Sequence, residues 1–218
     1  MTSLLRLREP ASAITHFIAM VLAIAGLIPA ILKAVSHMNT TGVWAVCIFM
    51  SSMILLYASS ATYHGINFGG KILEYFKKLD HMMIFVLIAG TYTPVCLLVL
   101  DGYVGLGLLV AVWALSIIGM TVKALWINCP KWFSSVIYIA LGWSCLACFK
   151  QILEALDTSA FVWLFIGGVI YTLGGIIYSL KIPGFDEKHK HFNTHDIFHL
   201  FVMGGSLCHF IFIYCFVI

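Results

Sequence analysis

The sequence predicts an all-α integral membrane protein, a bundle of seven transmembrane helices, because hydrophobic residues dominate it and charges are scarce. Of its 218 residues, 62% are hydrophobic and 10% are charged, and the mean hydropathy is +1.03. Soluble domains carry about 25% charged residues, so this composition excludes an ordinary soluble protein. Apolar runs of about 20 residues, long enough to cross a bilayer, follow one another with short interruptions.

Seven such runs account for most of the chain, which indicates a single membrane domain over residues 1–218. The first run is too long for the core of a cleaved signal peptide, and no small-residue cleavage site follows it, so we expect it to stay in the mature protein. The runs cover approximately residues 12–33, 43–66, 80–100, 104–125, 133–153, 160–180 and 196–217.

Basic residues lie mostly on one side of the predicted membrane. They precede the first run or lie in or next to the loops after the second, fourth and sixth: Arg6, Arg8, Lys71, Lys77, Lys78, Lys123, Lys131, Lys181, Lys188 and Lys190. Lys33 and Lys150 fall on the opposite side. The positive-inside rule therefore predicts a cytoplasmic N-terminus and a C-terminus outside. Topology explains these loops, and we expect no nucleic-acid partner.

Polar side chains that are unusual in membrane helices gather at the predicted cytoplasmic boundary. They are His16 on the first run, Ser60 and His64 on the second, Asp80 and His81 at the start of the third, and His195 and His199 on the seventh. The orientation of the runs is predicted from lysine and arginine alone. It therefore does not presuppose that these polar residues lie at the same depth in the membrane. Ionisable residues within spans are costly and usually functional.

The spacing of two of these histidines favours a metal site. His195 and His199 lie four positions apart in the sequence, so both imidazoles project from one face of a helix. A third histidine from another helix would complete three ligands and leave one position open, which is the arrangement of catalytic zinc. The chemistry therefore points to zinc as the cofactor.

Each of these residues also has a structural alternative. His64 could sit in the interface with its ring among the headgroups, and Asp80 could cap the third helix. His195 and His199 could be packing residues, as we expect for His209. The C-x-x-C pair of Cys145 and Cys148 lies within a run, where cysteine is most often a small apolar packing residue.

Four stretches of the sequence carry a family resemblance. They are EPASAITH at residues 9–16, SSATYH at 59–64, LDHMMIFVLIAGTYTP at 79–94 and HDIFHLFVMGGSLCH at 195–209. With these stretches in order over almost the whole chain, the protein resembles the hemolysin III-related branch of the progestin and adiponectin receptor family. The compact length is similar to that of the bacterial members, which implies a multi-pass protein of the bacterial plasma membrane.

The resemblance implies a zinc ion held by His64, His195 and His199. It also implies that Asp80 hydrogen bonds the zinc-bound water and that Ser60 belongs to the site, where it could help the zinc to polarise a carbonyl group. We expect His16 to lie next to the metal ligands without binding the ion. The expected function is zinc-dependent hydrolysis of a lipid amide, ceramide-like, or of an ester at the inner leaflet. Alternatives are a non-enzymatic regulator of membrane homeostasis, a receptor-like sensor or a cytolysin with a structural zinc. Transport is less favoured, because the polar residues gather at one end rather than at mid-depth.

Overall fold

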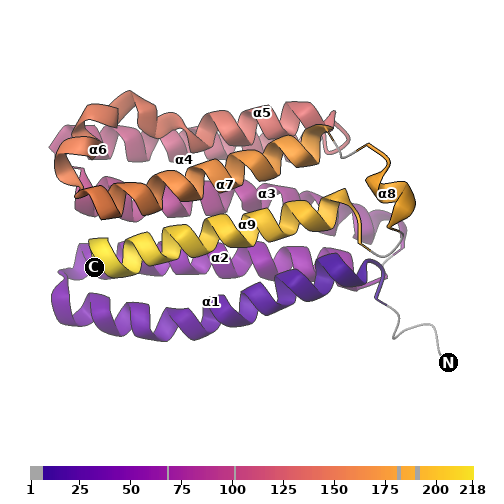
Figure 1. The fold of residues 1–218 in the computed structure, drawn as a ribbon, viewed down its shortest axis with the longest axis horizontal. Coiled ribbons are helices and arrows are strands. Elements are labelled where there is room, and N and C mark those ends of the chain that lie inside the picture. Colours follow the sequence, from indigo (N-terminus) through magenta and orange to yellow (C-terminus); the bar gives the residue numbers. More distant parts are fainter. Residues whose placement is uncertain (1–6, 68, 101, 181–182, 190–191) are drawn as a thin grey trace.

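Seven long helices lie side by side in the computed structural model, which describes residues 7–67, 69–100, 102–180, 183–189 and 192–218. Each is long and apolar enough to cross a bilayer, and within the described residues the regular elements are all helical. The predicted all-α bundle of seven membrane helices is confirmed. The first membrane helix begins at one end of the bundle, and the C-terminus of the chain lies at the other (Figure 1).

The membrane helices have the following bounds. They are α1 (Pro10–His37), α2 (Thr40–Gly65), α3 (Gly70–Pro94, extended by a π-helical turn at Val95–Val99), α4 (Gly102–Leu125), α5 (Lys131–Gly142) with α6 (Phe149–Ala155), α7 (Thr158–Leu180) and α9 (Thr194–Phe212, extended by a π-helical turn at Ile213–Val217). A short helix, α8 (Phe185–Lys188), lies in the connection between α7 and α9.

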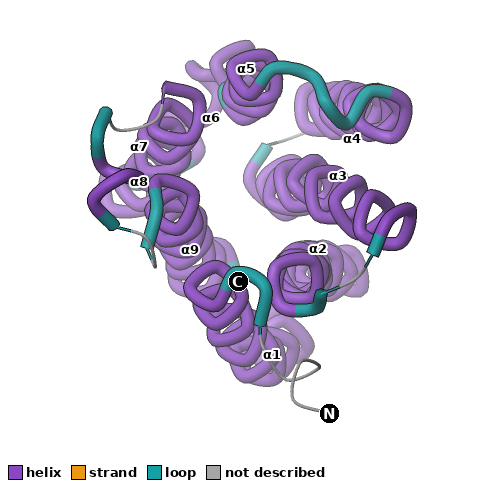
Figure 2. Tube along the Cα trace, turned by 90° about the vertical axis from the view of Figure 1, so that its right-hand side faces the viewer, coloured by secondary structure: helices purple, strands orange, loops and turns teal. Residues whose placement is uncertain are grey.

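The helices form a ring when the bundle is viewed from its end (Figure 2). From α1 to α4, each helix packs against the next, while α5 packs on α7, α7 on α9, and α9 returns to α1. The core is built from fully buried side chains such as Phe49 and Met50 on α2, Phe85 on α3 and Phe212 on α9. On α1, by contrast, large apolar side chains such as Leu22 face outward, as expected for a helix in contact with lipid.

The third helix begins ten residues earlier than the sequence predicts. It starts at Gly70 after Gly69 in the N-cap position, so Asp80 lies within the helix and does not cap it. The alternative role of Asp80 as an N-cap is therefore wrong. The extra turns carry Lys77 and Lys78, which lower the hydropathy there while remaining compatible with a helix.

The fifth membrane segment is interrupted, which the sequence does not predict. A 3₁₀ turn at Ser144–Cys148 separates α5 from α6. The Tyr92 hydroxyl donates a hydrogen bond to the Gly142 carbonyl (2.6 Å) and accepts one from the Cys145 amide (2.8 Å). Backbone groups freed at membrane depth need such partners, so Tyr92 stabilises the break.

The described basic residues follow the predicted asymmetry. Arg8, Lys71, Lys77, Lys78, Lys131 and Lys188 lie near the start of α1, α3 or α5 or on α8, and Lys123 lies in the last turn of α4. Lys33 lies in the last turns of α1 and Lys150 at the start of α6. The end of α1 and the short α6 both lie at the opposite end of the bundle (Figure 1). Arg6, Lys181 and Lys190 lie outside the described residues.

Candidate metal centre

Three histidines from two helices meet at the end of the bundle where α2 ends and α9 begins. His64 lies in the last turn of α2, and His195 and His199 lie in the first two turns of α9. One ring nitrogen from each lies within 4.8 Å of the others. His64 and His199 are each only 2% exposed, so the alternative of a His64 ring among the headgroups is wrong.

The distances within this cluster suit a tetrahedral ion. Nε2 of His64 lies 3.3 Å from Nε2 of His195. Two ligands at a zinc–nitrogen distance of about 2.0 Å in tetrahedral geometry are themselves about 3.3 Å apart. The His199 ring centroid lies 4.9 Å from that of His64 and 4.6 Å from that of His195. Three converging imidazoles, two of them buried and that of His195 half-buried, therefore offer the donor type of a zinc site, and the His64–His195 pair has the spacing of two zinc ligands.

Local sequence fixes where α9 starts. Asn193 is the N-cap, and its side chain accepts a hydrogen bond from the His195 amide (2.8 Å). Asp196 accepts one from the Asn193 amide (2.7 Å), which completes a capping box. The other Asp196 oxygen accepts a hydrogen bond from Ser12, so the same carboxylate ties the first turn of α9 to α1.

Asp80 and Ser60 adjoin the cluster through a small cavity of about 30 Å³. The cavity has room for a water molecule. Its polar lining consists of His16, Ser60, Asp80, His81, His195 and His199, together with the hydroxyl-bearing Tyr138 and Tyr178. Asp80 is buried, with Oδ2 3.4 Å from Nδ1 of His81. Asp80, Ser60 and two of the three clustered histidines thus share one cavity wall.

The other histidines fall into separate environments. His16 is buried and stacks on His199, which places it beside the cluster. His209 is buried deeper in the bundle against Tyr171, in agreement with the packing role we expect. His189 is exposed, and His191 lies outside the described residues.

One contact of the cluster was not found from the sequence. The Glu9 carboxylate, just before α1, pairs with Nδ1 of His64. Burial by itself raises the pKa of the Glu9 carboxyl, but the hydrogen bond to His64 and the electrostatic attraction of His64 and Arg8 bring that pKa below its ordinary value. Glu9 belongs to the EPASAITH stretch, yet nothing in the sequence indicates that it meets residue 64.

Comparison with known proteins gives one consistent family. The model of the haemolysin-III related family matches residues 5–210. The chain is 36% identical over 209 residues to the hemolysin-3 homolog of Bacillus subtilis (strain 168), which covers 95% of this chain and 94% of that one. It is 39% identical over 199 residues to hemolysin-3 of Bacillus cereus, which covers 91% of this chain and 86% of that one.

These matches confirm the resemblance seen in the sequence. Both relatives are bacterial, and seven apolar helices make this chain a multi-pass integral membrane protein of the bacterial plasma membrane. Because the family model and both relatives cover nearly the whole chain, the protein belongs to the haemolysin-III related family.

Proposed function

We propose that the protein is a zinc-dependent hydrolase that cleaves a lipid amide, ceramide-like, or a lipid ester at the inner leaflet. The observation that carries the proposal is the convergence of His64, His195 and His199 within 4.8 Å beside a cavity lined by Asp80. A site that only tied helices together would have no need of a buried carboxylate next to an open position.

Each residue of the site has a distinct role in this proposal. His64, His195 and His199 would hold zinc, which when bound supplies a Lewis acid that activates water and polarises a carbonyl group. Asp80 accepts the proton of the attacking water and then gives it to the leaving amine or alcohol as the bond to the carbonyl carbon breaks. The Ser60 hydroxyl donates to the carbonyl oxygen as negative charge develops there.

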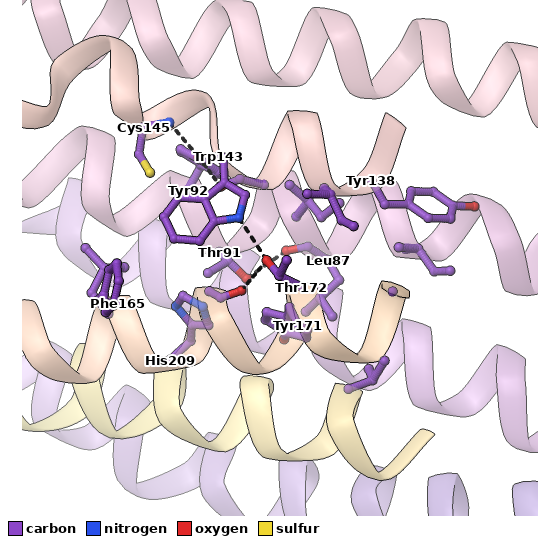
Figure 3. A pocket seen from close by; sticks show the side chains of 18 of the residues that line it. Leu87, Thr91, Tyr92, Tyr138, Trp143, Cys145, Phe165, Tyr171, Thr172 and His209 are labelled. Atoms are coloured by element: carbon purple, nitrogen blue, oxygen red, sulfur yellow. Dashed lines mark hydrogen bonds between the residues drawn. The ribbon is translucent and has the colours of Figure 1, made fainter. Parts of the chain in front are cut away.

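A second, larger cavity supports a lipid as the substrate. It has a volume of about 160 Å³ and lies between α3, α5, α7 and α9 (Figure 3). Several of its polar side chains are already paired: the Trp143 indole donates to Thr172 (2.8 Å), and the Thr91 hydroxyl donates to the Leu87 carbonyl (2.8 Å). Such a cavity suits an alkyl chain.

The two cavities adjoin one another. They share the lining residues Leu56, Ile84, Tyr138, Tyr178, Phe198 and Val202. A lipid whose carbonyl group lies beside Asp80 can therefore extend its chain into the apolar cavity. This arrangement favours an acyl amide or acyl ester over a small polar substrate.

The test combines metal content with turnover. Wild type, His199→Ala, Asp80→Ala and, as a control, His189→Ala at an exposed histidine are purified without chelators. Each protein is analysed for zinc and assayed against ceramides, other acyl amides and acyl esters. We expect about one zinc per chain in all but His199→Ala, and turnover in wild type and His189→Ala. Zinc without turnover in any protein would favour a structural or sensory zinc, and wild type without zinc would refute the proposal.

A lytic function is the second candidate, supported by the names of the two relatives, hemolysin-3 homolog and hemolysin-3. The apolar wall of the larger cavity argues against an aqueous path for ions. Release of a trapped dye from vesicles that contain the wild type protein, at equal rates for wild type and Asp80→Ala, would support lysis instead of hydrolysis.

A further inference from the structure

The Glu9 carboxylate is held against the outer side of one histidine of the cluster. Its Oε2 pairs with Nδ1 of His64, and the Glu9 amide donates to the His64 carbonyl (3.0 Å). The Arg8 amide donates to the Gly65 carbonyl (3.3 Å). The residues before α1 are thus attached to the last turn of α2 through both backbone and side chain.

The carboxylate is itself positioned by its neighbours. Nε of Arg8 lies 3.1 Å from Oε1 of Glu9, and the Arg8 guanidinium lies 4.2 Å from the ring centroid of Tyr63. Pro10 occupies the first turn of α1 and fixes the direction in which the chain enters that helix. Glu9 therefore reaches His64 from a constrained segment, although its own side chain is 43% exposed.

The contact decides which nitrogen of His64 is free. An ionised carboxylate can only accept hydrogen bonds, so Nδ1 must carry the proton. Nε2 then presents its lone pair, and this is the atom that lies 3.3 Å from Nε2 of His195. Nδ1 of His195, by contrast, has no hydrogen-bond partner among the described residues.

We propose that Glu9 is a positioning residue that sets the tautomer and orientation of His64 for metal binding. This inference rests on the proposed function, because it assigns the ion to the cluster described above. Carboxylates that hydrogen bond the second nitrogen of a metal-binding histidine raise its basicity, and their loss lowers metal affinity about 10- to 100-fold. The role assigned to Glu9 is of this kind, exerted from a segment outside the seven helices.

The experiment uses the full chain with three substitutions. Glu9→Ala removes the acceptor, Glu9→Gln keeps a neutral acceptor, and Glu74→Gln is the matched control, because Glu74 is an exposed glutamate paired with Lys78 on α3. Zinc affinity is measured by competition with a chelator. The tautomer of His64 is read by nitrogen-15 NMR of metal-free protein with labelled histidine, and His64→Ala identifies the signal.

We expect Glu9→Ala to weaken zinc binding about 10- to 100-fold and to lose the Nδ1-protonated form of His64. Glu9→Gln should lie between Glu9→Ala and wild type in affinity, and Glu74→Gln should match wild type. If Glu9→Ala does not fold, the intermediate affinity expected of Glu9→Gln still tests the inference.

Wild type affinity and an unchanged His64 tautomer in both Glu9 variants would overturn the role of Glu9. If wild type binds no zinc, the proposed hydrolase fails, whereas the NMR measurement on metal-free protein still decides whether Glu9 sets the His64 tautomer.

Discussion

The His16 ring lies face to face on the His199 ring, with centroids 3.7 Å apart and planes 7° from parallel. The two residues come from α1 and α9, which meet at this end of the bundle. The His16 ring also contacts the Tyr57 ring in an edge-on arrangement, with centroids 5.0 Å apart. His199 is therefore held in its rotamer by an aromatic stack rather than by its own helix alone.

Replacement of His16 should increase the mobility of the His199 side chain. His16→Ala removes a stacking interaction worth about 1 kcal/mol and leaves a cavity beside the His199 ring. We expect a lower thermal unfolding temperature and a severalfold weaker zinc affinity, because His199 gains freedom. His16→Phe keeps a flat ring in place and should stay close to wild type. The exposed His189→Ala is the control, and equal zinc affinity in His16→Ala and wild type would contradict a supporting role for His16.

Val202 lies where the small polar cavity meets the larger apolar one. Val202→Phe should narrow this passage without touching the three histidines. We expect unchanged zinc content and a loss of turnover that is roughly 10-fold greater for long-chain than for short-chain acyl substrates. Leu200→Phe, on an outward-facing position of the same helix, should change neither. An equal loss for long and short chains would argue against an acyl path through this passage.

Hydropathy alone predicts the helix count because each span must bury or present apolar side chains over the full bilayer thickness. The same argument predicts that His64, Asp80, His195 and His199 lie at one level. Their approach to one another in space depends on which helices are neighbours in the ring, and a single sequence does not determine that order. The pairing of His195 and His199 on one face of α9 could be predicted from the sequence, because it depends only on their spacing of four positions.

Contacts between residues that are far apart in the sequence could not be predicted from the sequence. Glu9 meets His64 through residues that precede a helix, where no periodicity places a side chain. The break between α5 and α6 was missed for a related reason, because the segment is continuously apolar and the partner that stabilises the break, Tyr92, comes from another helix. The early start of α3 was missed because charged turns lower the hydropathy without ending the helix.

The Tyr92 hydroxyl should contribute measurably to stability. Tyr92→Phe keeps the ring but leaves the Gly142 carbonyl and the Cys145 amide without their partner. An unpaired polar group inside a protein costs about 1–3 kcal/mol, so we expect a clear decrease in the unfolding temperature in detergent. Tyr103→Phe is the control, because Tyr103 is 93% exposed and should behave like wild type. Equal unfolding temperatures for the two variants would show that the break does not need the hydroxyl.

Close packing between α2 and α3 depends on Gly90. A Cβ atom at this position would lie 2.1 Å from Oγ and 2.5 Å from Cβ of Ser52. Gly90→Ala should therefore destabilise the bundle by about 1–3 kcal/mol, measured by thermal unfolding. Gly107→Ala has no atom within 4 Å of the new Cβ and should be neutral. Adding Ser52→Gly to Gly90→Ala should recover much of the loss, and a Gly90→Ala protein as stable as wild type would refute this contact.

The proposed orientation can be tested at the two ends of α4. Tyr103 and Leu125 are 93% and 83% exposed and lie at its first and last turns. Tyr103→Cys and Leu125→Cys are made separately in a chain whose exposed Cys215 is replaced by serine, and intact cells are treated with a membrane-impermeant maleimide. Because basic residues favour the cytoplasmic side, Tyr103→Cys should be labelled at once and Leu125→Cys after permeabilisation. The reverse pattern would place the histidine cluster at the outer leaflet, and the substrate would then have to be sought among the lipids of that leaflet.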